Sequence, residues 1–200
     1  MMNRIAALFM LALGAAGAAA QPQDARNDRE AEEREAQLIC GLRPRVIELA
    51  IDRWTDEIAR LYDFDEDQLH NTRDIFQGRI PAWLEQNRPV LNELWNDFLE
   101  ARLGAEPPSR EKVAQWASRA LPVLQDFTEL MQGIGEDVRP HLTEEQQTLL
   151  DGHMAGFQVF ANFTTQRLAG WANGEFDAET EWLGYARARS SQRQLQRQVE

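Results

Sequence analysis

The chain has a single cysteine, Cys40, and a single lysine, Lys112, among its 200 residues. One cysteine excludes an internal disulfide, so the stability of the fold must come from packing. An unpaired cysteine of an exported protein is either buried or links two chains, and burial is the interpretation that we favour. Acidic residues are in excess, with 33 acidic against 21 basic residues and a net charge of −12. Because phosphates would be repelled, nucleic acid is not expected as a partner.

Catalytic motifs are also missing. The sequence has no Gly-x-Ser-x-Gly, no phosphate-binding glycine loop, no His-Glu-x-x-His and no Cys-x-x-Cys. Acidic residues are frequent, but on amphipathic helices they are typical of solvated faces. The sequence therefore predicts a protein that is not an enzyme and needs no cofactor.

The candidates for metal binding are few. Asp63, Asp65 and Asp67 alternate like the start of a calcium loop, but the sixth position is Gln68, where that loop needs glycine. No two histidines share the i,i+4 spacing of a helical ligand pair; they are His70, His141 and His153. We assign no metal site and keep a metal-responsive protein as an alternative.

The first 20 residues have the pattern of an export signal. Arg4 precedes an apolar run over residues 5–13, and a small-residue cleavage pattern ends at Ala20. No later stretch is apolar enough to span a bilayer. We expect a periplasmic or otherwise exported protein that is not stably inserted in the membrane after cleavage.

Residues 21–43 are mostly polar and charged, which predicts a fraying arm or, alternatively, an arm that binds a partner. At the other end, residues 175–200 predict a short helix from Asp177 that buries Trp182 and Tyr185, followed by an arginine-rich tail. Between them, residues 44–174 form the expected domain.

Helical periodicity runs through this domain, and no alternating strand pattern occurs. We expect one helix from Pro44 to Tyr62 and a second run from Asp65 to Leu103, kinked or broken at Pro81 and Pro89. A third helix should run from Ser109 to Pro140, and a fourth from Thr143 until Asn173-Gly174. The predicted fold class is all-α, with four main helices, long and kinked, in an open bundle or a cradle-like arrangement, with a homodimer as a further alternative.

Two helix starts repeat the same signal. Asp65 with Gln68, and Thr143 with Gln146, have the spacing of a capping box, in which each side chain bonds the backbone N–H of the other residue. The two boxes lie 78 residues apart, and we leave internal duplication open. They are expected to act as helix caps, not as contacts to a partner.

The aromatic residues are a further group that could have a function. Most lie on the apolar stripes of the helices, where a bundle core is the simple interpretation. The alternative is that kinked helices leave part of this surface exposed as a concavity that holds a partner. The residues assigned to such a surface are Trp83, Trp95, Phe157 and Trp171.

The segment Leu142-Thr143-Glu144-Glu145-Gln146 matches the LTxxQ motif, and Phe64-Asp65-Glu66-Asp67-Gln68 is similar to a degenerate first copy. In this motif and its placement the chain resembles the Spy/CpxP-type periplasmic proteins. The resemblance implies an all-helical, cradle-shaped protein, often an antiparallel dimer. It also implies an ATP-independent chaperone that shields unfolded proteins, or a regulator of envelope stress or metal sensing.

Our leading hypothesis is therefore an exported, non-enzymatic protein that binds unfolded or partner proteins through a partly apolar concave surface. A periplasmic metal sensor and a structural assembly protein are the alternatives.

Overall fold

The computed structural model describes residues 38–104, 107–178 and 181. It contains α3 (Pro44–Tyr62), α4 (Glu66–Leu103), α5 (Arg110–Val138), a 3₁₀ turn η1 (Arg139–His141) and α6 (Glu144–Ala172). Within these residues there is no strand, so the predicted all-α class is confirmed. The predicted signal peptide at 1–20, most of the polar arm, Trp182, Tyr185 and the arginine-rich tail lie outside the described residues.

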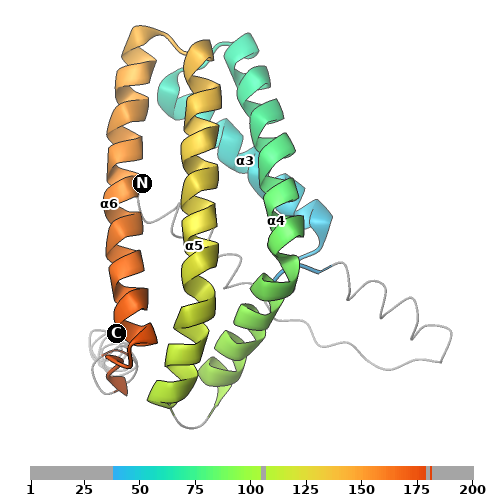
Figure 1. Ribbon diagram of the computed structural model, residues 1–200. Coiled ribbons are helices and arrows are strands. Elements are labelled where there is room, and N and C mark those ends of the chain that lie inside the picture. Colours follow the sequence, from blue (N-terminus) through green and yellow to red (C-terminus); the bar gives the residue numbers. More distant parts are fainter. Residues whose placement is uncertain (1–37, 105–106, 179–180, 182–200) are drawn as a thin grey trace, which may run out of the picture.

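The three long helices are antiparallel neighbours. α5 lies in the middle and packs against both α4 and α6, while the shorter α3 packs against α4 (Figure 1). Short connections at the ends of the helices enforce this order, as expected for a bundle. α3 covers only the upper part of the bundle, since it has 19 residues and α4 has 38.

Each long helix begins at the cap that the sequence predicts. Asp65 and Thr143 each form a complete capping box, and Ser109 accepts the backbone N–H of Lys112 at 3.3 Å. α3 ends at Asp63, whose φ of 53° is left-handed and turns the chain sharply into α4. These local signals decide where the helices begin and end.

α4 is one unbroken helix despite Pro81 and Pro89. Of the two predicted alternatives, a kink and a break, the kink is observed, since α4 is continuous and changes direction in its lower half (Figure 1). Each proline costs about 3 kcal/mol inside a helix. Buried residues on both sides, among them Phe76 and Leu91, pack against neighbouring helices and offset that cost.

Two hydrophobic clusters form the core. The upper cluster joins α3, the first half of α4, the end of α5 and the start of α6, and its buried members include Ile51, Tyr62, Phe76, Ile134 and Phe157. The lower cluster joins the second half of α4, the first half of α5 and the end of α6, and includes Leu94, Trp95, Ala117, Val123 and Leu168.

The folded part begins before Pro44. Ile39 and Cys40 are 4% and 1% exposed and belong to the lower cluster. Asn92 of α4 holds this segment, because its Oδ1 accepts the Cys40 N–H at 2.7 Å and its Nδ2 donates to the Leu38 carbonyl at 2.9 Å. Residues 38–43 are thus part of the domain and not of the predicted arm, whose polar composition ends at Gln37. Burial of Cys40, as favoured from the sequence, is confirmed.

In the part of the chain that the structure describes, no helix is long and apolar enough to cross a membrane.

Candidate functional site

The two capping boxes meet at one end of the bundle. Gln68 Nε2 donates to Gln146 Oε1 at 2.8 Å, and Gln146 Nε2 donates back to Gln68 Oε1 at 3.1 Å. The second amide hydrogen of Gln68 goes to the His141 carbonyl at 2.9 Å, and that of Gln146 to the Tyr62 carbonyl at 3.0 Å. Each glutamine therefore caps its own helix and also holds the turn that precedes the other helix.

This junction satisfies its buried polar atoms. Each side-chain oxygen also accepts a cap N–H, from Asp65 at 3.1 Å and from Thr143 at 2.9 Å. A network with every donor used fixes geometry more firmly than isolated bonds do. The predicted role of Asp65, Gln68, Thr143 and Gln146 as structural caps is confirmed. The flanking Phe64 is half-buried and Leu142 is buried, and both face the upper cluster.

A cavity of about 350 Å³ lies just below this junction, between α3 and α6. α3 contributes Trp54, Ile58 and Tyr62, α4 contributes Phe76, and α5 contributes Met131 and Ile134. The wall from α6 contains two glycines at i,i+4 spacing together with Leu150, His153, Met154 and Phe157. None of the lining residues is Asp, Glu, Lys or Arg, and His153 is the one basic side chain among them.

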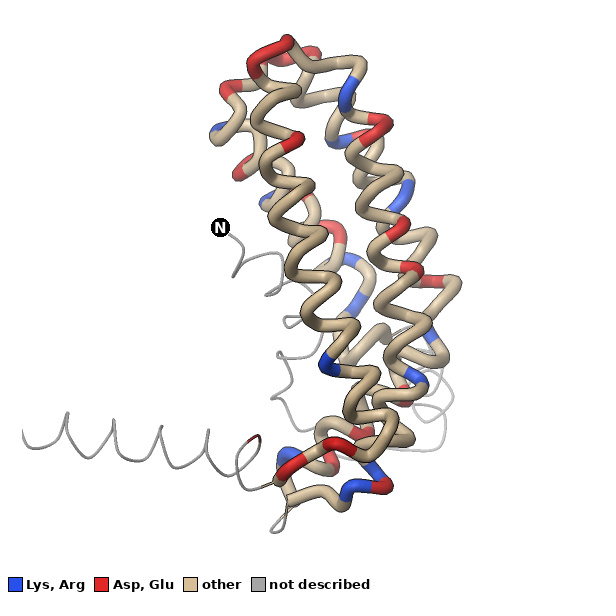
Figure 2. Tube along the Cα trace, turned by 60° about the vertical axis from the view of Figure 1, so that its left-hand side comes forward, with Lys and Arg blue, Asp and Glu red and all other residues tan. Residues whose placement is uncertain are grey.

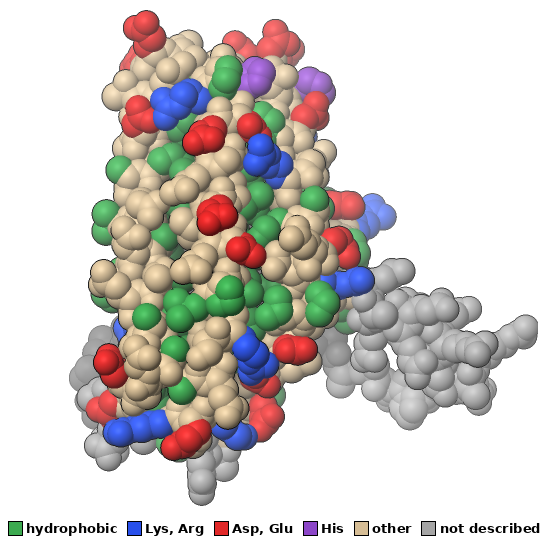
Figure 3. Space-filling view, in the orientation of Figure 1, with side chains coloured by type: hydrophobic (Ala, Val, Ile, Leu, Met, Phe, Trp, Pro, Cys, Tyr) green, Lys and Arg blue, Asp and Glu red, His purple; other side chains and the backbone are tan. Residues whose placement is uncertain are grey.

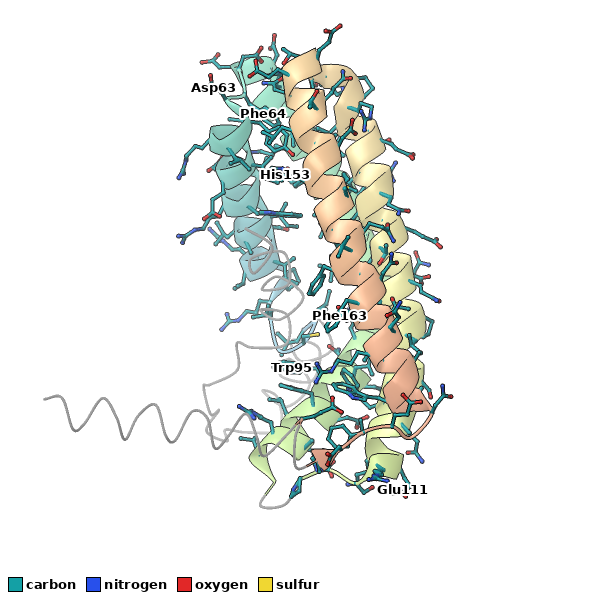
Figure 4. All side chains as sticks on the ribbon, turned by 90° about the vertical axis from the view of Figure 1, so that its left-hand side faces the viewer. Asp63, Phe64, Trp95, Glu111, His153 and Phe163 are labelled. Atoms are coloured by element: carbon teal, nitrogen blue, oxygen red, sulfur yellow. The ribbon has the colours of Figure 1, made fainter. Side chains whose placement is uncertain are left out.

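The polar groups of the cavity are few and well placed. The Tyr62 hydroxyl and His153 Nδ1 are 2.6 Å apart, which makes a short hydrogen bond between α3 and α6. Burial raises the pKa of the Tyr62 phenol to about 12, so the phenol keeps its proton at neutral pH. In Figure 4, His153 lies in the space between α3 and α6, close to the turn that holds Asp63 and Phe64.

Thr72 adds one unused hydroxyl to this wall. Its side chain is fully buried, and its Oγ1 has no hydrogen-bond partner. Buried helical threonines normally donate to the carbonyl four residues earlier, as Thr55 does to Ile51 at 2.9 Å. A buried hydroxyl without a partner costs about 1 to 3 kcal/mol. Among the described residues, Arg73 Nε and Trp83 Nε1 are the other buried side-chain atoms without a hydrogen-bond partner.

The outer face of α6 exposes large apolar side chains within a stretch that has no charge. Residues 152–166 contain no Asp, Glu, Lys or Arg, although 27% of the chain is charged and about four would be expected in 15 residues. Val159 and Phe163 are 67% and 62% exposed. Figure 2 shows this uncharged stretch along α6. In Figure 3, charged side chains are more frequent toward the two ends of the molecule, and hydrophobic ones reach the surface between them.

The four residues that were assigned to a partner-binding concavity have different surroundings in the structure. Trp95 is 3% exposed and packs against Phe98 in the lower cluster, so it is not available to a partner and that assignment is wrong. Phe157 is 6% exposed but lines the cavity. Trp83 is half-buried against Phe127.

Trp171, the fourth of these residues, is occupied within the chain. Its Nε1 donates to Glu181 at 2.8 Å, the guanidinium of Arg167 lies over its ring, and Phe176 packs edge-on against it. This cluster closes the lower end of α6 instead of presenting an open aromatic face.

The three histidines have separate surroundings. His153 bonds Tyr62, and His70 pairs with Asp74 at 3.4 Å on the exposed face of α4. His141 lies in the turn before α6 and is exposed. Among the residues that can be described, no group of three or more His, Cys, Asp or Glu side chains is placed to hold a metal ion.

Sequence reasoning missed Tyr62, Thr72 and the exposed pair Val159 and Phe163. The absence of charge between Asp151 and Arg167 was visible in the sequence and is the signal that would have identified the α6 surface. Nothing in the sequence pairs Tyr62 with His153, which lie 91 residues apart.

Comparison of the chain with protein-family models, with curated proteins and with solved structures gave no match.

Proposed function

We propose that this chain is an exported, non-enzymatic binding protein of Spy/CpxP-like type that holds unfolded or partner proteins without ATP. The surface that binds them is the outer face of α6 around Val159 and Phe163, within the uncharged stretch 152–166. The observation that carries the proposal is the exposure of Val159 and Phe163 within this uncharged stretch.

The energetics suit reversible capture. Full burial of an exposed Val or Phe side chain contributes about 1.5 to 3 kcal/mol. Two such residues, with the partly exposed Phe160 beside them, supply weak, non-directional binding to many apolar segments. Burial of apolar surface is non-directional and does not depend on one client sequence, so the surface suits a protein that binds varied clients.

The net charge of −12 selects among clients. Acidic residues around an apolar patch repel acidic chains and attract basic ones, chiefly through the rate of association. We therefore expect protection of basic unfolded proteins at low salt, and weaker protection as salt screens the attraction.

The test is suppression of light scattering by an aggregating basic client, reduced lysozyme, compared between two double variants. Val159→Gln with Phe163→Gln removes the apolar pair of α6. The control, Leu49→Gln with Leu103→Gln, removes two leucines that are 60% and 82% exposed on α3 and α4. Both changes lie on the surface and should alter stability by less than about 0.5 kcal/mol each.

We expect the α6 variant to lose most of its protection and the control to keep it. Equal protection by both variants would show that α6 is not the binding surface. If the unaltered protein fails to suppress aggregation at several-fold excess, the chaperone function itself is wrong.

Export is part of this proposal and has its own test. The pattern of residues 1–20 supports removal of a signal peptide, and the amino-terminal sequence of the protein recovered from cells should then begin at Gln21.

A further inference from the structure

We infer that the cavity between α3 and α6 is a binding site for a small uncharged amphiphile, an apolar molecule with one hydroxyl group. This inference is independent of the client-binding surface proposed above, because it concerns the interior lined by Tyr62, Thr72 and His153 and not the outer face of α6.

The size of the cavity suits such a ligand. Its volume is about 350 Å³. Pockets that take small organic ligands span about 300 to 1,000 Å³, and a dry apolar cavity of about 150 Å³ already binds benzene. The space therefore accommodates a body of roughly two aromatic rings or a chain of about ten carbons.

The lining decides the chemistry of the ligand. The walls are made of aromatic, aliphatic and methionine side chains, which favour an apolar body. No Asp, Glu, Lys or Arg lines this space, so an ammonium group would enter it without an ionic partner, and His153 is the one basic side chain that a carboxylate would meet. Burial of an unpaired charge is strongly unfavourable, which favours an uncharged head group.

The polar groups favour a hydroxyl. Either Tyr62 donates to His153 Nδ1 and leaves the Nε2–H of His153 as a donor, or the other tautomer leaves the phenol O–H free. In both states the pair offers a further hydrogen bond, and a hydroxyl is able to complete it as donor or as acceptor. Thr72 in the same wall is fully buried, so Tyr62 and His153 are the polar groups that a ligand would meet.

The cavity is blocked most directly from Met154. This α6 residue lines the cavity and is half-buried, so a larger side chain at this position occupies the space that the ligand would fill. Leu130 of α5 is the matched control, because it is also half-buried against the upper cluster but does not line the cavity.

The probe is N-phenyl-1-naphthylamine, an uncharged molecule whose fluorescence increases in apolar sites. We expect saturable binding to the full chain, at least a tenfold loss of affinity in Met154→Trp, and no change in Leu130→Trp. Circular dichroism and thermal unfolding of both variants are measured first, so that binding is compared between folded proteins.

Competition identifies the head group. We expect 1-decanol to displace the probe at about tenfold lower concentration than decanoate at pH 8. Tyr62→Phe keeps the ring and removes the hydroxyl, and it should weaken displacement by decanol about three- to tenfold, the effect of one neutral hydrogen bond. The affinity of this variant for the probe is measured first, so that displacement is compared as the affinity for decanol.

Equal binding of the probe by Met154→Trp and Leu130→Trp would overturn the assignment of the cavity. Tighter binding of decanoate than of decanol would overturn the uncharged class of ligand. The double variant Val159→Gln with Phe163→Gln should retain full binding of the probe, which separates this site from the client surface.

Discussion

The glutamine pair Gln68–Gln146 offers the sharpest test of how the bundle is held together. We consider each glutamine replaced by alanine, alone and together. Gln68→Ala removes four hydrogen bonds: two to Gln146, one to the His141 carbonyl and one from the Asp65 N–H. At about 1 kcal/mol net for each bond, the expected loss of stability is about 3 to 4 kcal/mol.

Gln146→Ala should cost a similar amount, because it loses the same two shared bonds and those to Tyr62 and Thr143. The double variant loses the shared bonds only once. The sum of the single effects should therefore exceed the double effect by the value of two hydrogen bonds, about 2 kcal/mol. This coupling free energy is the quantity that the structure predicts.

The assay is urea unfolding of all four proteins. The free energy of unfolding is extrapolated to zero urea, and its slope against urea concentration should be the same in all four. The control is a second glutamine pair, Gln132 with Gln158, which joins α5 and α6 by a single exposed bond of 2.6 Å. Because water competes for exposed groups, its coupling should stay below about 0.5 kcal/mol. A coupling for Gln68–Gln146 no larger than that of the control would refute the proposed role of the junction.

Two further predictions concern buried single groups. Thr72→Val should stabilise the protein by about 1 kcal/mol, since it removes a hydroxyl without a partner. Thr55→Val should destabilise it by about 1 kcal/mol, since it breaks the hydrogen bond to the Ile51 carbonyl. Thermal unfolding measures both variants, and shifts of the unfolding temperature in the same direction would contradict the argument. Burial raises the pKa of the Cys40 thiol from 9.0 to about 11. The unfolded chain therefore ionises first, so stability is unaffected below pH 9 and falls as the pH rises toward 11. Urea unfolding at each pH should show this fall to be steeper in the unaltered protein than in Cys40→Ala, and parallel curves would contradict it.

The helices themselves could be predicted because their signals are local. Asp65, Ser109 and Thr143 each accept a backbone N–H within the next three residues, so the chain marks these helix starts without help from the fold. The end of α3 at Tyr62 and that of α6 at Ala172 are equally local, since a left-handed Asp63 follows the first and Asn173-Gly174 the second.

Pro81, Trp95 and Ile39 show where local reasoning failed or left alternatives open. Whether a proline breaks α4 depends on the burial of residues around it, which is a property of the packed bundle. Trp95 and Trp171 both lie on apolar stripes, yet one is in the core and the other at the edge. Ile39 and Cys40 follow a polar arm, but the side chain of Asn92, 52 residues beyond Cys40, brings them into the domain.

The sequence by itself determined the all-α class, the helix limits and the acidic, single-cysteine character, because capping, periodicity and charge are properties of neighbouring residues. Only the tertiary structure decided that the two capping boxes face each other, that Tyr62 meets His153, and that a cavity lies between α3 and α6. Contacts between residues 78 to 91 positions apart leave no trace in a local pattern, and they exist only once α5 has placed α4 and α6 at its two sides.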